Sequence, residues 1–262
     1  MGKKSRNTGE TVNDRQAKIN AAAEANKVGP NKILIGTIVA LVAIIAVVAA
    51  VIISDQRSRP DSTATGSDVP AAAAGMGEGF VANEDVTLQE GAPTIDIYED
   101  FRCPYCHTAH AIFHDTVKSL ADEGKAQVVY HFKTVIDTNA GGDQSLKAAS
   151  SAMCAADAGK FNEYHDEILT GIVNAGGQQP NWGPQFFTSS AESVGITGAE
   201  LQTFNACVRD GKYDAYIEST EAQSRRDNVM GTPVYKVGGE ELDLNGLTPE
   251  ALVQAVENAT GQ

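Results

Sequence analysis

The sequence predicts an α/β domain in which a small sheet is flanked by helices and interrupted by an inserted block of helices. Three observations support this prediction. Short apolar runs typical of strands lie near both ends of the region that begins at residue 84. Longer segments with helical spacing lie between these runs and after the last of them. The predicted order is therefore strand, helix, strand, a block of helices, helix, strand, strand and helix.

The N-terminal part of the chain predicts a membrane anchor. Residues 1–32 are polar, and we expect them to form a disordered tail in the cytoplasm. Residues 33–53 carry no charged side chain and are long enough to cross a bilayer as one helix. Lys and Arg are more frequent before this segment than just after it, which places the N-terminus in the cytoplasm and the rest of the chain outside. The alternative is a cleaved signal peptide, although the apolar core of such a peptide is normally shorter.

A linker is predicted between the anchor and the folded domain. Residues 54–83 are rich in Ser, Asp, Ala, Gly and Pro and show no apolar period. We therefore expect a flexible linker here and a folded domain over residues 84–262.

Four strands and a hairpin are predicted in the folded domain. The strands cover residues 94–98, 126–132, 233–237 and 240–244. Gly238 and Gly239 separate the last two strands, and two glycines at such a place are typical of a hairpin turn.

Seven helices are predicted around these strands. The last helix begins after Thr248, whose hydroxyl can cap it, and Pro249 suits its first position. The helices of the middle block cover about residues 140–210, and we interpret this block as an insertion packed over the sheet. The six earlier helices cover residues 104–122, 144–158, 160–173, 184–194, 198–209 and 212–228.

The charge of the chain restricts its partners. The formal net charge is -14, and the acidic residues concentrate after residue 53. Nucleic acid requires a basic surface, so we expect no nucleic-acid partner.

Cys103 and Cys106 form a C-x-x-C motif where the first predicted strand passes into the first predicted helix. Free N–H groups and the dipole at a helix N-terminus stabilise a thiolate. Pro104 suits the first helical position because it has no N–H to leave unpaired. We expect thiol–disulfide exchange, with Cys103 as the exposed sulfur and Cys106 as its more buried partner.

Two other interpretations of the motif remain open. A zinc site would need further ligands, and the sequence holds no second C-x-x-C. His107 follows Cys106, and C-x-x-C-H is also the pattern that attaches c-type haem. The haem interpretation is disfavoured because the motif follows a buried strand.

Three histidines, His107, His110 and His114, share one face of the first predicted helix. Such a row could bind a metal, but we expect a polar surface face and no metal. A protonated His107 next to the cysteines would stabilise the thiolate and make the disulfide more oxidising.

Several features together resemble the DsbA-like thioredoxin-fold oxidoreductases. They are D-F-x-C-P-x-C after a strand, a helical insertion, and Gly231-Thr232-Pro233 at the start of a late strand. With the anchor and the Ala-rich acidic domain, the chain is similar to the actinobacterial extracytoplasmic branch. The resemblance implies a thioredoxin fold from about residue 84 to the C-terminus. It also implies that Pro233 is cis and lies against the disulfide, and that Thr232 offers backbone hydrogen bonds to a substrate strand.

Departures from the family pattern concern the residues around the cysteines. Tyr105 gives the Pro-Tyr dipeptide of glutaredoxins, whereas the best-known family members carry Pro-His, so the redox potential stays open. Glu99 and Asp100 precede the motif, and they could either relay protons or cap the first helical turn.

Cys154 and Cys207 lie in apolar patterns within the helical block. Outside the cytoplasm we expect two such cysteines to pair, and some actinobacterial relatives carry a second disulfide in this block. A second redox-active pair is the alternative to a structural disulfide.

The resemblance implies an enzyme that introduces disulfides into reduced exported proteins. It further implies reoxidation by a membrane partner of the DsbB or VKOR type. We expect no cofactor, and we expect a monomer because nothing in the chain resembles the dimerisation domain of the isomerases. The alternatives are a disulfide reductase or isomerase, and a non-enzymatic binding module such as an exported-protein chaperone or a c-type haem protein.

Overall fold

The computed structural model describes residues 68–174 and 182–261. The predicted tail, the predicted anchor at residues 33–53 and the first part of the predicted linker lie outside the described residues. Within the described ranges, none of the helices combines the length and the apolar character that a membrane crossing requires.

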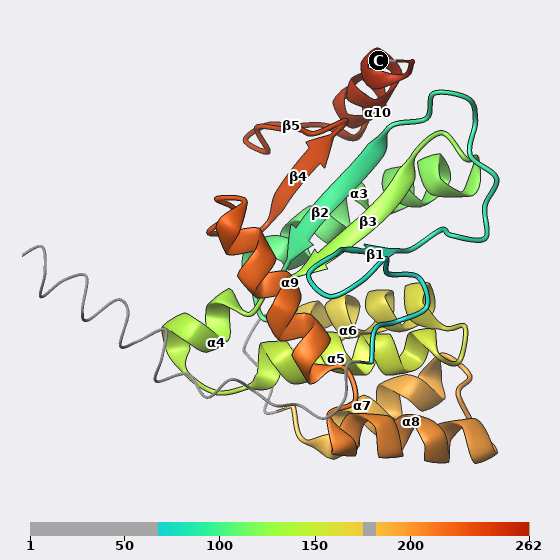
Figure 1. Cartoon of the computed structure of the whole chain (residues 1–262), viewed down its shortest axis with the longest axis vertical. Coiled ribbons are helices and arrows are strands. Elements are labelled where there is room, and N and C mark those ends of the chain that lie inside the picture. The colour runs from blue at the N-terminus through green and yellow to red at the C-terminus, as the bar shows by residue number, and fades with distance from the viewer. Residues whose placement is uncertain (1–67, 175–181, 262) are drawn as a thin grey trace, which may run out of the picture. The chain divides into compact units, whose positions relative to one another are not determined.

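The described residues form one five-stranded sheet in the order β1-β3-β2-β4-β5 (Figure 1). The central strand β2 (Thr94–Glu99) runs parallel to β3 (Gln127–Phe132) and antiparallel to β4 (Val234–Val237). The short strands β1 (Phe80–Val81) and β5 (Glu240–Glu241) pair antiparallel with β3 and β4. The sheet therefore places the carboxyl end of β2, where the cysteine motif begins, beside the start of β4.

Gly238 and Gly239 form the turn between β4 and β5, as the sequence predicted. Both have positive φ, 57° and 87°, which is the conformation that glycine adopts without a Cβ clash. The predicted α/β order is thus confirmed, although β5 is shorter than expected.

Helices cover both faces of the sheet (Figure 1). Helix α3 connects β2 to β3 and packs with α10, which also contacts β4. Helix α9 packs on β3, and Figure 1 shows it in front of the sheet with α3 behind. The helices are α3 (Pro104–Asp122), α4 (Val135–Ala140), α5 (Gln144–Ala156), α6 (Phe161–Asn174), α7 (Pro184–Ser193), α8 (Gly198–Asp210), α9 (Asp214–Arg226) and α10 (Pro249–Ala259).

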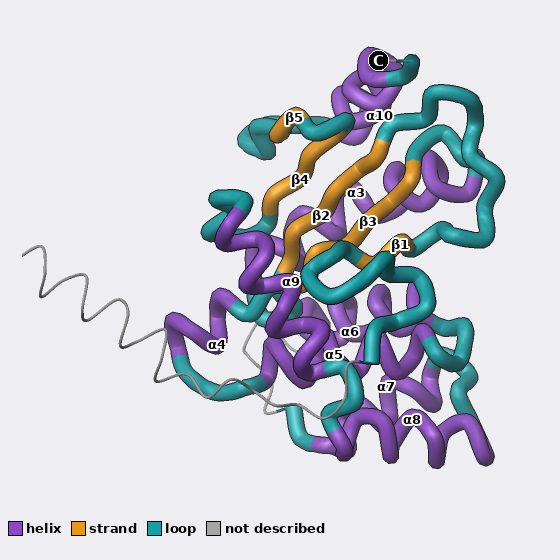
Figure 2. The backbone as a smooth tube through the Cα atoms, viewed as in Figure 1, coloured by secondary structure: helices purple, strands orange, loops and turns teal. Residues whose placement is uncertain are grey.

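The inserted block consists of helices α4 to α8, which gather at one end of the sheet (Figure 2). Helix α5 contacts α6, α7, α8 and α9, so it lies at the centre of this block. Small residues such as Ala148, Ser151 and Ala152 let the neighbouring helices approach α5 closely, and all three are buried. Cys154 on α5 and Cys207 on α8 form the expected disulfide, with 5.9 Å between their Cα atoms.

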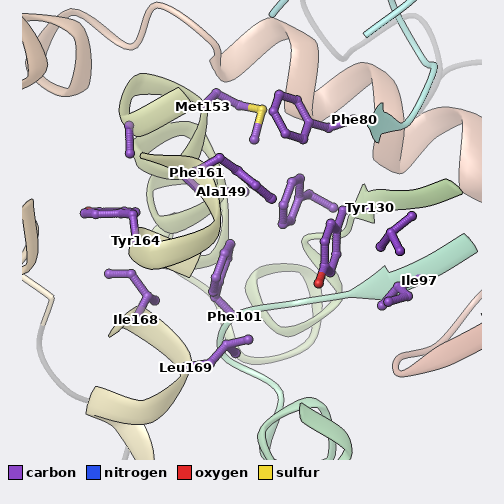
Figure 3. Packing of buried hydrophobic residues seen from close by; sticks show 14 of the residues in the cluster. Phe80, Ile97, Phe101, Tyr130, Ala149, Met153, Phe161, Tyr164, Ile168 and Leu169 are labelled. Atoms are coloured by element: carbon purple, nitrogen blue, oxygen red, sulfur yellow. The ribbon is translucent and has the colours of Figure 1, made fainter. Parts of the chain in front are cut away.

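A cluster of aromatic side chains joins the sheet to the insertion (Figure 3). Phe80 on β1 and Phe161 on α6 have ring centroids 4.3 Å apart, and Tyr130 on β3 lies 5.6 Å from Phe161. Phe101 stacks on Phe132 at 5.4 Å, just before the cysteine motif. The sheet and the insertion therefore share one core, which fixes the cysteine motif relative to both.

The predicted start of the folded domain near residue 84 is wrong, because the chain is packed on the domain before that point. Ala72 and Phe80 are 8% and 4% exposed. The Asn83 side chain donates to the carbonyl of Ala126 at 3.0 Å and accepts from the N–H of Val128 at 2.9 Å. A strand of two residues is too short to show an alternation of apolar and polar side chains. The composition of residues 68–83 was therefore the main available signal, and it indicated a linker.

Candidate active site

The cysteine motif forms the first turn of helix α3. Cys103 is the N-cap residue with extended backbone, φ -80° and ψ 116°, and Pro104 follows at the first helical position. The N–H groups of Cys106 and His107 donate to the carbonyl of Cys103 at 3.0 and 3.3 Å. The proline and the open first turn thus place the Cys103 sulfur at the positive end of the helix, as predicted.

Both cysteines are buried in the reduced state that the structure describes. Cys103 is 4% exposed and Cys106 is 2% exposed, so the expectation of an exposed Cys103 is wrong. Their chain neighbour Tyr105 is 75% exposed. The thiol of Cys103 lies 3.5 Å from the carbonyl oxygen of Thr232, which covers the sulfur from the side of β4.

The peptide bond between Thr232 and Pro233 is cis, as the family resemblance implied. It lies directly before β4, which pairs antiparallel with β2. Because β2 leads into the cysteine motif, this pairing brings the cis bond against Cys103. Met230, just before this segment, is 64% exposed.

The surroundings of the two sulfurs give them opposite acidities. A hydrogen bond from the Cys106 thiol is the main cause that lowers the pKa of Cys103 to about 5. Burial opposes this shift, and the Thr232 side chain and the N–H groups of Cys106 and Tyr105 add smaller favourable contributions. Burial and the bond to Cys103 raise the pKa of Cys106 well above its usual value. At neutral pH Cys103 is therefore a thiolate and Cys106 a thiol that donates to it.

Asp100 supports a neighbouring turn and does not cap helix α3. Its carboxylate accepts the N–H of Arg102 at 2.8 Å and the N–H of Ile136, in α4, at 2.9 Å. Burial raises the pKa of Asp100 to about 6. Helix α3 has no side-chain cap, so of the two roles expected for Asp100 and Glu99 the capping role is wrong.

Glu99 forms a buried pair with His165 on α6. The Oε1 atom of Glu99 lies 2.5 Å from Nε2 of His165. Burial opposes protonation of His165, but the charge of Glu99 and bonds to Asp166 and Glu99 raise its pKa to about 9. The negative charge of Glu99 also contributes to the raised pKa of Cys106, so this carboxylate acts on the dithiol electrostatically.

The histidines of α3 are not the polar surface face that we expected. His107 is 5% exposed and donates through Nε2 to the carbonyl of Phe101 at 2.7 Å. It therefore positions the segment before the motif. His110 and His114 face Asp166 on α6 at 3.5 and 3.2 Å.

His165 was missed by sequence reasoning. No motif contains it, and its role follows from tertiary contacts with rings such as Tyr130 at 4.6 Å and Phe101 at 5.5 Å. The available signal was the dipeptide His165-Asp166 on a predicted helix, and a dipeptide is too short a pattern to indicate a site.

A dithiol of this kind beside a cis-proline, on a sheet with this order and a helical insertion, defines the DsbA-like thioredoxin-fold thiol–disulfide oxidoreductases. The chain belongs to the Thioredoxin family, whose model matches residues 89–258. A comparison with curated proteins gave no significant match.

Solved structures with this fold come from several actinobacteria. Oxidised DsbA from Mycobacterium tuberculosis is 26% identical, with a TM-score of 0.57 over 70% of this chain and 92% of the other. The thiol-disulfide oxidoreductase MdbA from Actinomyces oris is 20% identical, with a TM-score of 0.56 over 66% and 83%. MdbA from Corynebacterium diphtheriae is 23% identical, with a TM-score of 0.55 over 67% and 86%. The similarity to MdbA shows the fold, and together these structures confirm the resemblance inferred from the sequence.

Proposed function

We propose that the protein is an extracytoplasmic disulfide oxidase that introduces disulfides into exported proteins. The observation that carries this proposal is the lowered pKa of Cys103, about 5. A stabilised thiolate stabilises the reduced enzyme, and an enzyme whose reduced form is stable has a strongly oxidising disulfide. The similarity to DsbA from Mycobacterium tuberculosis supports the same direction.

The reaction starts from the oxidised enzyme, with a bond between Cys103 and Cys106. A substrate thiolate attacks the Cys103 sulfur, the bond to Cys106 breaks, and the Cys106 sulfur takes up a proton, as its raised pKa favours. A second substrate thiolate then attacks the substrate sulfur of the mixed disulfide and expels Cys103 as a thiolate. The substrate loses two electrons, the enzyme gains them, and the low pKa of Cys103 makes it a good leaving group.

The backbone of Thr232 is placed to hold the substrate during this exchange. Its carbonyl lies next to Cys103, and the cis bond to Pro233 presents it at the start of β4. An extended substrate segment would pair with this backbone and bring its cysteine to the Cys103 sulfur.

The location outside the cytoplasm and the reoxidation step belong to the same proposal. The disulfide between Cys154 and Cys207 supports an oxidising compartment, since structural disulfides persist there. The apolar segment at residues 33–53 would hold the enzyme at the membrane. A membrane partner of the DsbB or VKOR type would take the two electrons from the reduced pair.

The reduction potential of the Cys103–Cys106 pair tests the direction of the reaction. Thioredoxin has a thiol pKa of about 7 and a potential of about -270 mV, and each tenfold stabilisation of the reduced form adds about 30 mV. A pKa of about 5 for Cys103 therefore predicts a potential near -210 mV or higher. Equilibration with glutathione buffers measures it, and a value at or below that of thioredoxin would favour a reductase.

A Cys103→Ser variant tests whether the protein acts as an enzyme at all. The variant should no longer form disulfides in a reduced exported substrate, because the sulfur that accepts the first attack is gone. Full activity in this variant would contradict the catalytic mechanism.

A further inference from the structure

Three side chains that can bind a metal converge between helices α3 and α6. They are His110 on α3 and the neighbouring residues His165 and Asp166 on α6, and their ligand atoms all lie within 4.8 Å of one another. We propose that these three residues form a binding site for a divalent transition metal, with Zn²⁺ as the preferred ion. This proposal does not depend on the oxidase function.

Two distances within the cluster match those between neighbouring ligand atoms of a tetrahedral zinc site. The Oδ1 atom of Asp166 lies 3.5 Å from Nε2 of His110 and 3.5 Å from Nδ1 of His165. Zinc bonds of about 2.0–2.2 Å at tetrahedral angles place neighbouring ligand atoms about 3.3–3.5 Å apart. All three ligand atoms lie within 4.8 Å of one another, so binding would draw the two histidine nitrogens together by at most about 1.5 Å.

Glu99 supplies the outer contact that such a site requires. Its Oε1 atom lies 2.5 Å from Nε2 of His165, which leaves Nδ1 of His165 facing Asp166. Metal-binding histidines nearly always donate their second N–H to a carboxylate or carbonyl, which fixes the ring and raises its basicity. Glu99 and His165 are 4% and 1% exposed, so this arrangement is built into the core.

His114 lies beside the three ligands, at the mouth of the site. Its Nδ1 atom lies 3.2 Å from Oδ1 of Asp166, and it stands one helical turn after His110 on the same face. His114 and Asp166 line a cavity of about 440 Å³, through which an ion can reach the cluster. We therefore expect His114 to reach a bound ion through a water and not directly.

The chemistry of the ligands selects the ion. Imidazole nitrogens suit Zn²⁺, Cu²⁺, Fe²⁺ and Ni²⁺, whereas Ca²⁺ and Mg²⁺ take oxygen ligands. Histidines with a single carboxylate therefore argue against the oxygen-seeking ions, and two histidines with one carboxylate are a ligand set that occurs at zinc sites.

Bound metal would tie the helix that carries the dithiol to the inserted block. His110 belongs to α3, which begins at the cysteine motif, and the other two ligands belong to α6. Glu99 contacts His165 and also acts on Cys106, so one carboxylate connects the metal site to the dithiol.

Zinc binding to the oxidised full-length chain in detergent tests the proposal. Oxidation of Cys103 and Cys106 removes the thiols as competing ligands, and residues 1–67 contain neither His nor Cys. Titration of Zn²⁺ against a chromophoric chelator should show one equivalent bound. Titration of Co²⁺ should give the visible absorption of a tetrahedral site without a thiolate charge-transfer band.

Variants assign the bound ion to the cluster. His110→Ala should lower the zinc affinity at least tenfold, and Glu99→Gln should lower it by about 10–100-fold through His165. His131→Ala is the matched control, because His131 lies outside the cluster and pairs with Asp96 at 2.8 Å. The zinc affinity of this variant should equal that of the parent chain.

Thermal melts in the presence of a chelator establish whether each variant is folded. If His110→Ala does not fold, His114→Ala provides a second variant at the site. The proposal is overturned if the oxidised chain binds no zinc. It is equally overturned if neither His110→Ala nor His114→Ala weakens binding.

Discussion

Replacing Cys106 by alanine should raise the pKa of Cys103 and leave it less reactive at low pH. The hydrogen bond from Cys106 is the largest cause of the low Cys103 pKa, which lies at about 5. A hydrogen bond to a charged group contributes about 1.5–3 kcal/mol, which corresponds to about 1–2 pKa units. The pKa of Cys103 in Cys106→Ala should therefore lie between about 6 and 7. The pH dependence of the rate of alkylation by iodoacetamide measures it.

Cys106→Ser is the matched control for this experiment. A serine hydroxyl has nearly the size of the thiol and can still donate to the Cys103 sulfur, so the pKa should stay closer to that of the parent. The parent itself is measured in the reduced state. If alanine leaves the pKa at its parent value, the Cys106 bond is not the cause, and the helix N-terminus with Thr232 must supply the stabilisation.

Two further predictions concern stability. The pKa of Cys103 falls from 9.0 to about 5 on folding, so its contribution to the stability of the reduced form is complete above pH 9.0 and is lost as the pH falls through about 5. Urea unfolding should show the reduced form losing about 3.6 kcal/mol relative to the disulfide form between pH 8 and pH 5, and parallel pH profiles would disprove the shift. Glu221→Ala should lower the free energy of unfolding by about 3–5 kcal/mol, because it leaves the buried ammonium group of Lys133 without its partner. In the parent, Nζ of Lys133 lies 3.1 Å from Oε2 of Glu221. Glu163→Ala is the matched control: it removes an exposed partner of Lys160 and should lower the free energy of unfolding by less than about 1 kcal/mol. Equal losses in the two variants would argue against an effect of the buried charge.

Elements with a local signal at each end were predicted well from the sequence. Helix α3 has the predicted limits, because Pro104 fixes its first turn and a run of helical spacing continues to Asp122. The hydroxyl of Thr248 accepts the N–H of Ala251 at 3.2 Å, so the predicted cap of the last helix is confirmed. The hairpin at Gly238-Gly239 had the same kind of local signal.

Elements that depend on distant contacts escaped prediction. Strand β1 has two residues and owes its place to β3, and helix α4 has no buried residue from which an apolar face could be read. The Thr232 carbonyl covers Cys103, although the two residues are 129 positions apart in the sequence. The His165–Glu99 pair likewise joins two segments that nothing in the sequence connects.

The disulfide between Cys154 and Cys207 has a consequence for the biogenesis of the protein. It closes a loop with a sequence separation of 53 residues between two helices of the insertion. If the protein is exported as we propose, a newly exported chain carries four thiols. Its insertion is then closed only after the same chemistry that we propose for the mature protein. Under that proposal the protein is one of its own substrates. Mature molecules at the membrane would form the disulfide between Cys154 and Cys207 in newly made molecules.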